Sequence, residues 1–213
     1  MLTPVDLIYP PRCILCQSLL SKHKSLCGNC EKNAPFFRKQ KTKLRFLDSY
    51  TAVWYYKGYV RDSLLRYKFS TWDFLDRPYG RLLAEKIRQD FPQGIDVLTW
   101  VPTAGKRRRK RGYDQCKLLA KAVGRELGIR PRKILRKIKN NPAQSGISDA
   151  ATRRANAAGA YQVIRPELVK GRRVLVIDDI LTTGATVGEC AKMLKFAGAG
   201  KVFCAVMAAS PKL

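Results

Sequence analysis

Hydrophobic residues recur along this chain in two alternating patterns, one typical of buried strands and one of amphipathic helices. Apolar and β-branched runs predict strands over 50–56, 96–102, 172–179 and 201–209. Apolar residues at helical spacing predict helices over 59–70, 78–91, 113–128 and 186–198. Strands that alternate with helices favour a parallel sheet with helices on its faces, so the expected fold class is α/β.

A separate pattern precedes the first strand. Four cysteines, Cys13, Cys16, Cys27 and Cys30, are spaced C-x2-C-x10-C-x2-C, which predicts two knuckles that bind one Zn²⁺ ion. Four thiolates close the coordination shell, so this zinc is expected to be structural rather than catalytic. His23 lies between the pairs and is interpreted as a solvated loop residue, with replacement of a ligand as the alternative. The predicted domains are a zinc-ribbon module with its basic linker at 1–43 and an α/β domain at 44–213.

The other three cysteines follow the patterns of the core. Cys116 and Cys190 are in register with apolar helical stripes, and Cys204 alternates with Val202 and Val206 as in a strand. Nucleophilic cysteine catalysis is not expected, because the single histidine belongs to the zinc segment.

Candidate chemistry is concentrated in "VLVIDDILTTGAT" at 174–186. Four apolar residues form a buried strand, and Asp178 and Asp179 follow at its carboxyl end, where parallel sheets bind ligands. A small-residue turn then leads into a helix, whose first amides can hold a phosphate. Carboxylates accept hydrogen bonds from neutral hydroxyls, so a ribose 5-phosphate is the expected ligand. The residues expected to contact it are Asp178, Asp179, Thr182, Thr183, Gly184, Ala185 and Thr186.

This stretch resembles the signature of type I phosphoribosyltransferases, which binds 5-phosphoribosyl 1-diphosphate (PRPP). The resemblance implies that Asp178 and Asp179 hold the ribose hydroxyls and that 182–186 bind the 5-phosphate. It also implies that Mg²⁺ bridges the ribose and the pyrophosphate.

The resemblance extends to the ComF/GntX family of competence proteins, which join an N-terminal zinc ribbon to a phosphoribosyltransferase domain. The family pattern Val-Pro, then Arg-Gly-Phe-Asn-Gln, corresponds here to Val101-Pro102 and "RGYDQ" at 111–115, where Tyr113 and Asp114 depart from it and the tyrosine is a mild change. Asp114 replaces an amide by an anion near an expected phosphate site, so we expect this side chain to face away from the ligand.

Two further segments are assigned by this resemblance. "TAGKRRRKR" at 103–111 is similar to the pyrophosphate loop and contributes Lys106, Arg107 and Arg111. Its cations exceed what one diphosphate needs, which leaves a nucleic-acid role and a solvated loop as alternatives. The segment 141–163 is poor in hydrophobic periodicity and is expected to be a mobile loop that closes over the site. Gln144, Arg153 and Asn156 match family positions there, and Arg153 is expected to neutralise the departing pyrophosphate.

Charge and composition add expectations about partners. The 213 residues include 42 Lys+Arg and 16 Asp+Glu, a net charge of +26 that favours polyanionic partners. No apolar run is long enough for a membrane span and no signal peptide is recognisable, so a cytoplasmic protein without membrane insertion is expected.

Two functions follow as hypotheses. The resemblance implies a ComF-type protein of natural transformation that binds PRPP and single-stranded DNA, with a competence helicase or another DNA-uptake protein as partner. The alternative is an active phosphoribosyltransferase that transfers ribose 5-phosphate from PRPP to a base or an amine. Such an enzyme needs a pocket for the acceptor, and residues before about 95 are expected to supply it.

Overall fold

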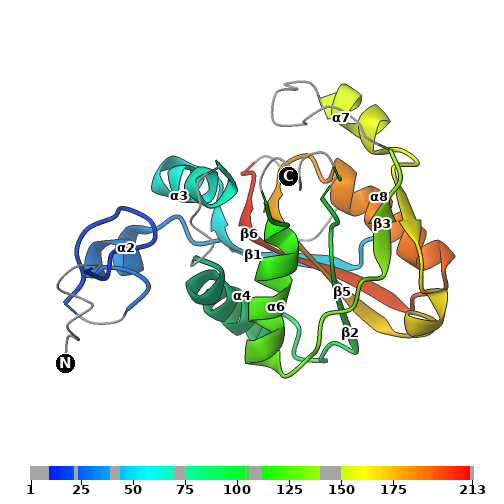
Figure 1. The fold of residues 1–213 in the computed structure, drawn as a ribbon, viewed down its shortest axis with the longest axis horizontal. Helices are drawn as coiled ribbons and strands as arrows, with labels where there is room; N and C mark the ends of the chain where they lie inside the picture. Colours follow the sequence, from blue (N-terminus) through cyan, green and yellow to red (C-terminus); the bar gives the residue numbers. More distant parts are fainter. Residues whose placement is uncertain are drawn as a thin grey trace.

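The computed structural model describes residues 10–21, 24–38, 44–69, 75–103, 105, 112–139 and 150–211. Its centre is a parallel sheet with the strand order β1-β6-β5-β2 (Figure 1). The strands are β1 (Ser49–Tyr55), β2 (Val97–Trp100), β5 (Arg173–Leu181) and β6 (Lys201–Ala209). All three pairings between neighbouring strands are parallel, which confirms the expected α/β fold class.

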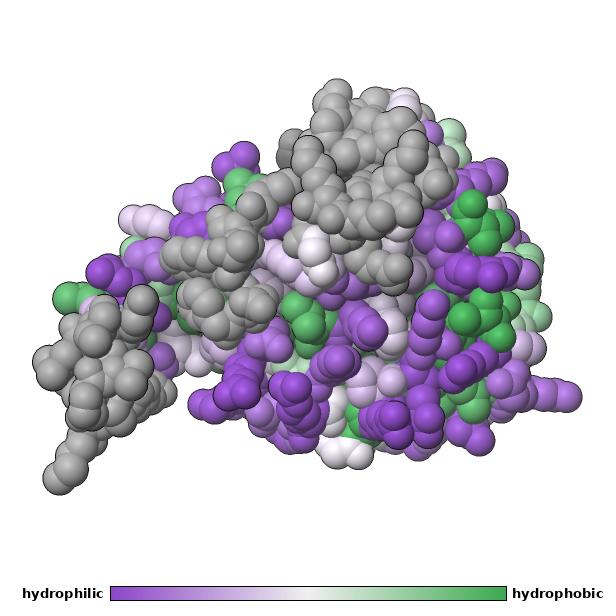
Figure 2. Space-filling view, viewed as in Figure 1, coloured by the Kyte–Doolittle hydropathy of each residue, from purple (hydrophilic) through white to green (hydrophobic). Residues whose placement is uncertain are grey.

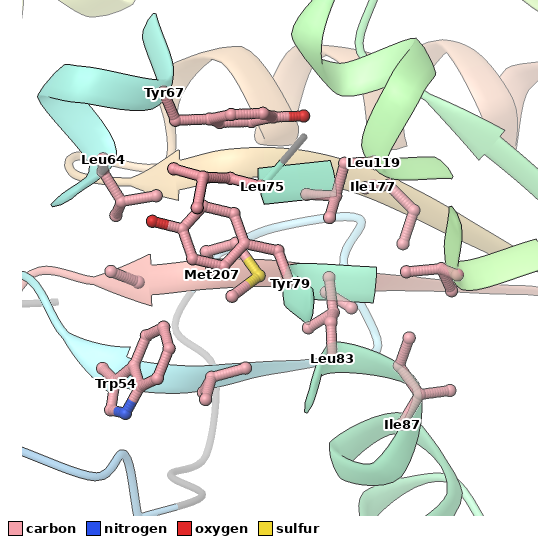
Figure 3. Packing of buried hydrophobic residues seen from close by; sticks show 14 of the residues in the cluster. Trp54, Leu64, Tyr67, Leu75, Tyr79, Leu83, Ile87, Leu119, Ile177 and Met207 are labelled. Atoms are coloured by element: carbon pink, nitrogen blue, oxygen red, sulfur yellow. The ribbon is translucent and has the colours of Figure 1, made fainter. Parts of the chain in front are cut away.

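Helices cover both faces of this sheet. The main helices are α3 (Gly58–Phe69), α4 (Asp76–Asp90), α6 (Gln115–Leu127) and α8 (Ala185–Phe196). Ile177 and Met207 contribute to the core that α3, α4 and α6 cover, while Val176 and Val206 contribute to the core beneath α8. In the first core the rings of Tyr67 and Tyr79 meet edge to face, with centroids 5.3 Å apart (Figure 3). Burial on both faces explains why the strands have nearly continuous apolar sequences.

The zinc-ribbon segment contains the short helix α2 (Gly28–Asn33) and packs on the core beside α3 (Figure 1). After α2 the chain runs along β1, where the amide of Phe37 donates to the carbonyl of Val53 at 3.0 Å. Ile14 and Leu15 of the ribbon are buried in the same cluster as Trp54. The boundary at residue 43 stays a prediction, but the ribbon and the α/β domain share one hydrophobic core.

Several predicted elements differ from the observed ones. The strand predicted to end at Asp179 continues to Leu181, because Ile180 and Leu181 pair with Ala208 and Ala209 of β6. The helix predicted to open at Pro78 begins two residues earlier, at Asp76. The segment 141–163, for which no helix or strand was predicted, contains helix α7 (Ala150–Ala157) and strand β4 (Tyr161–Val163).

Strand β4 pairs antiparallel with a short strand that the sequence pattern did not predict, β3 (Leu135–Lys137). A 3-10 turn (Pro166–Leu168) then leads into β5. Three-residue strands carry too little periodicity to be recognised, and this pair is stabilised by contacts between distant segments.

Hydrophilic residues cover most of the described surface on the face drawn in Figure 2. Among the described residues, no helix combines the length and the apolar character needed to cross a membrane.

Candidate functional site

The two adjacent aspartates lie inside β5, two and three residues before its end. Asp178 and Asp179 are 9% and 5% exposed, so they are buried within the strand rather than following its end. Two features bury them: β5 continues beyond them, and side chains from α3 and α6 pack against their carboxylates. Buried adjacent carboxylates need partners, and the structure supplies them from distant segments.

Helix α6 contributes two of these partners from its first turn. The side-chain amide of Gln115 donates to Oδ2 of Asp179 at 3.0 Å, and the thiol of Cys116 donates to Oδ1 of Asp178 at 3.3 Å. The backbone amide of Asp179 donates to the same oxygen of Asp178 at 2.9 Å. Within the described residues, the second oxygen of each carboxylate has no hydrogen-bond partner in the protein. The site therefore keeps one acceptor oxygen on each aspartate.

Helix α3 contributes a cation. Nζ of Lys68 lies 3.1 Å from Oδ2 of Asp179, and both side chains are largely buried. Burial lowers the pKa of Lys68, but the negative charges of Asp179 and Asp178 outweigh it and raise the pKa above its usual value. Lys68 is therefore positively charged and neutralises part of the negative charge of the acidic pair.

The surroundings of Asp178 raise its proton affinity. Burial, and then the negative charge of Asp179, raise the pKa of Asp178 to about 7, although hydrogen bonds from Asp179 and Cys116 and the charge of Lys68 oppose the change. Near neutral pH, Asp178 thus exchanges a proton while Lys68 keeps its charge beside Asp179.

The turn after β5 has the geometry of an anion-binding loop. Gly184 adopts a left-handed conformation with φ +73°, and helix α8 begins directly after it at Ala185. Thr182, Thr183 and Thr186 are half-buried, and Thr186 forms a hydrogen bond with Tyr161 of β4. The first turn of a helix has amides without intrahelical acceptors, and these amides attract anions.

A hydrogen bond joins Thr103 and Asp114, which lie on either side of the expected pyrophosphate loop. The Thr103 hydroxyl donates to Oδ1 of Asp114 at 3.2 Å, and the same oxygen caps α6 by accepting the amide of Lys117 at 3.2 Å. The Asp114 side chain is thus engaged by the protein, which explains an aspartate at this position of the motif. Lys106, Arg107 and Arg111 lie outside the described residues.

The lid residues are only partly described. Gln144 and the side chain of Arg153 lie outside the described part of the chain, while Asn156 is half-buried on α7. The connection after α7 is attached to α8, since the amide of Gly159 donates to Glu189 at 2.9 Å.

The four N-terminal cysteines form one cluster. The ligand atoms of Cys13, Cys16, Cys27 and Cys30 all lie within 4.8 Å of one another, and the sulfurs of Cys16 and Cys27 are 3.6 Å apart. Zinc–sulfur bonds of about 2.3 Å place tetrahedral thiolates about 3.8 Å apart, so this cluster fits a Zn²⁺ ion. Burial raises the pKa of Cys16, but hydrogen bonds from Ser18, Cys13 and Cys27 outweigh it and lower the pKa to about 6.

Two contacts of this site were not predicted from the sequence. Cys116 was interpreted as a core residue; it is buried, but its thiol also contacts Asp178. Lys68 carried no signal, because it lies about 110 positions before its partner at the end of an amphipathic helix.

Comparisons with known proteins agree with both parts of this architecture. A family model of the double zinc ribbon domain matches residues 4–42, and a model of the phosphoribosyl transferase domain matches residues 114–213. Competence protein F of Haemophilus influenzae is 29% identical over 90% of this chain and 82% of its own length. Competence protein ComFC of Streptococcus pneumoniae is 26% identical over 83% of this chain and 77% of its own length.

A third relative, the DNA utilization protein YhgH of Escherichia coli K12, is 26% identical over 94% of this chain and 83% of its own length. Among solved structures, glutamine PRPP amidotransferase of B. subtilis aligns with 63% of this chain and 26% of its own, at 24% identity and a TM-score of 0.43. Both domain models and the relatives that match most of the chain point to one family. The chain is therefore similar over most of its length to competence protein F and its relatives, and it combines a match to the double zinc ribbon domain with a match to the phosphoribosyl transferase domain.

Proposed function

We propose that this chain binds PRPP at the carboxyl end of β5 and acts on single-stranded DNA during DNA uptake. The main observation in favour of this ligand is the arrangement of Asp178 and Asp179. One carboxylate oxygen of each residue is hydrogen-bonded or ion-paired within the protein, and the other has no partner among the described residues. Two acceptor oxygens on adjacent residues suit a vicinal diol, because each hydroxyl donates one hydrogen bond.

The loop that follows supports the same ligand. Residues 182–186 connect the acidic pair to the first turn of α8, and Gly184 lets the backbone approach an anion closely. In this proposal the ribose diol contacts the aspartates and the 5-phosphate contacts this loop. In this proposal Lys106, Arg107 and Arg111 bind the diphosphate, and Arg153 closes over it with Gln144 and Asn156.

Magnesium fits the ligand rather than a dedicated protein cage. Mg²⁺ usually keeps several waters and is held through phosphates and one or two carboxylates. The described site offers two carboxylates, of which Asp179 is already paired with Lys68. When bound with PRPP, the ion supplies charge neutralisation on the diphosphate.

The DNA part rests on charge and on the relatives. Proteins similar to this chain over most of its length are named for competence and for DNA utilization. The net charge of +26 favours binding to a phosphate backbone, and the sequence 106–111 contains six consecutive cations. A cytoplasmic protein that contacts a competence helicase or another DNA-uptake protein is consistent with this role.

Transfer of ribose 5-phosphate to an acceptor is the second candidate. The acidic pair and the phosphate loop would serve it equally, because pentosyl transfer needs bound cations and a positioned ligand more than a protein nucleophile. Pyrophosphate release measured against a panel of bases and amines distinguishes transfer from binding alone.

The decisive experiment is calorimetric titration with PRPP and Mg²⁺. Changing both Asp178 and Asp179 to Asn keeps the buried volume and removes both charges, so we expect affinity to fall at least tenfold. Glu167→Gln is the matched control, because Glu167 is exposed on the 3-10 turn and outside the site. Equal affinity in the double variant and the wild type would overturn the proposed ribose site.

A further inference from the structure

Helix α3 contacts the zinc ribbon with one part and the acidic pair with another. On the ribbon side, the guanidinium of Arg66 donates to the carbonyl of Leu15 at 2.7 Å, and the hydroxyl of Ser63 donates to the carbonyl of Ile14. Ile14 and Leu15 are the two residues between the ligands Cys13 and Cys16. The ribbon loop that encloses the metal therefore accepts hydrogen bonds directly from α3.

These contacts are buried. Ser63 is fully buried, and Ile14 and Leu15 are 4% and 2% exposed. The Ser63 hydroxyl also contacts the hydroxyl of Tyr79, which links the ribbon, α3 and α4 at one point. A short ribbon of this kind keeps its loop conformation through its metal, so the two acceptor carbonyls hold their positions when zinc is bound.

The last turn of α3 contacts the segment before α6 and the acidic pair of β5. The hydroxyl of Tyr67 donates to the carbonyl of Gln115 at 3.0 Å, and the hydroxyl of Tyr113 donates to the carbonyl of Tyr67 at 2.8 Å. Lys68 follows and forms its ion pair with Asp179 at 3.1 Å. This turn therefore contacts both the "RGYDQ" segment and the acidic pair.

Arg66, which contacts the ribbon, and Lys68, which contacts the acidic pair, are two positions apart in the sequence. Both lie on one continuous helix, where neighbouring residues move together. The ribbon contact and the site contact are therefore held on nearby positions of one helical turn.

We propose that Lys68 is a positioning residue of the ligand site, and that the zinc ribbon holds it there through Arg66 and Ser63. This inference rests on the proposed binding of PRPP at the acidic pair. Lys68 occupies Oδ2 of Asp179 and fixes that carboxylate, so that its other oxygen is directed to the ligand. Its positive charge also offsets part of the negative charge that two adjacent aspartates place at the site. Zinc bound in the ribbon then influences the affinity for PRPP at the acidic pair, although the zinc does not contact PRPP.

The test compares PRPP and Mg²⁺ affinity in variants of the full chain, with zinc content and thermal melting measured for each. Lys68→Met should weaken binding at least tenfold, and Lys68→Arg should restore most of the affinity because it keeps the charge. Arg61→Met is the matched control, since Arg61 is exposed on the same helix and forms its ion pair with its neighbour Asp62 rather than with the acidic pair. Arg66→Met should weaken binding while the protein retains its zinc.

Zinc removal then tests the coupling. In the wild type, chelation should lower PRPP affinity, whereas in Lys68→Met it should have little further effect, because the connecting residue is already absent. If the chelated protein does not remain folded, Arg66→Met with full zinc content gives the answer. Normal PRPP affinity in both Lys68→Met and Arg66→Met would overturn this inference and leave the ligand site standing, whereas a wild type without PRPP affinity would overturn the proposed function itself.

Discussion

The thiol of Cys116 lies 3.3 Å from Oδ1 of Asp178 and joins the first turn of α6 to β5, the inner strand that carries the acidic pair. Burial and the charge of Asp179 raise the pKa of Asp178 from 3.8 to about 7, so the folded protein holds a proton that the unfolded chain releases. The protonated Asp178 carboxyl contributes its full stabilisation of the folded state below about pH 4, and this contribution is lost as the pH rises through about 7.

Asp178→Asn removes this proton and should flatten the dependence of stability on pH between about 4 and 7. The difference from the wild type should be on the order of 2–4 kcal/mol across that window. Urea unfolding at a series of pH values measures it, without ligand. A wild type that gains stability as pH rises from 5 to 7, relative to the variant, would contradict the assignment.

The second prediction concerns the metal. Purified protein should contain about one zinc per chain, and changing both Cys13 and Cys16 to Ser should remove it, because two thiolates cannot hold a structural ion tightly. Elemental analysis and thermal melting report the loss of metal and of stability together. Cys190→Ala, a core cysteine outside the cluster, should keep the zinc.

The third prediction concerns the phosphate loop. Gly184→Ala should destabilise the protein by about 1–3 kcal/mol, because Gly184 has φ +73° and an added Cβ would lie 2.5 Å from the side chain of Leu44. PRPP affinity should fall with it. Gly188→Ala on the same helix has open space and should be neutral or stabilising by about 0.5–1 kcal/mol. Equal melting temperatures for the two variants would disprove this account of the turn.

The fourth prediction concerns Asp114 as a helix cap. Asp114→Ala removes the acceptor for Lys117 and for Thr103 and should cost about 1 kcal/mol, whereas Asp114→Asn should retain most of the stability. Chemical unfolding compares the two. A large loss in the asparagine variant would indicate that the charge, rather than the cap, is required.

The fifth prediction concerns DNA. Changing Arg107, Arg108 and Arg109 to Ala should weaken binding to single-stranded DNA and reduce the slope of log affinity against log salt by about 2, at roughly 0.7 per phosphate contact. PRPP affinity should fall less, because the loop at 182–186 is unchanged.

A control of equal charge changes the exposed Arg125, Arg130 and Arg132, which lie at or beyond the end of α6. A triple variant at 107–109 that keeps its DNA affinity and salt slope but loses PRPP binding would assign the cationic loop to the nucleotide alone.

Much of the fold follows from local sequence. The strand over 201–209 was predicted with its observed bounds, and α6 ends at Gly128, which adopts the left-handed conformation expected of a helix cap. Regular periodicity and end signals of this kind depend on residues close in the chain. The paired spacing of Cys13, Cys16, Cys27 and Cys30 likewise predicted their cluster, because each knuckle is itself a local structure.

The sequence by itself determined the α/β class, the cysteine cluster and the position of the acidic pair and of the turn that follows β5. Tertiary structure decided how the pair is held: its burial, its contact with Cys116 and Gln115, and its ion pair with Lys68. It also decided that α3 connects this pair to the ribbon. Such contacts join residues about 50 to 110 positions apart. The periodicity of hydrophobic residues predicts only the face of a helix or strand on which a residue lies. Charge neutralisation and hydrogen bonding depend on which of these faces meet in the folded chain.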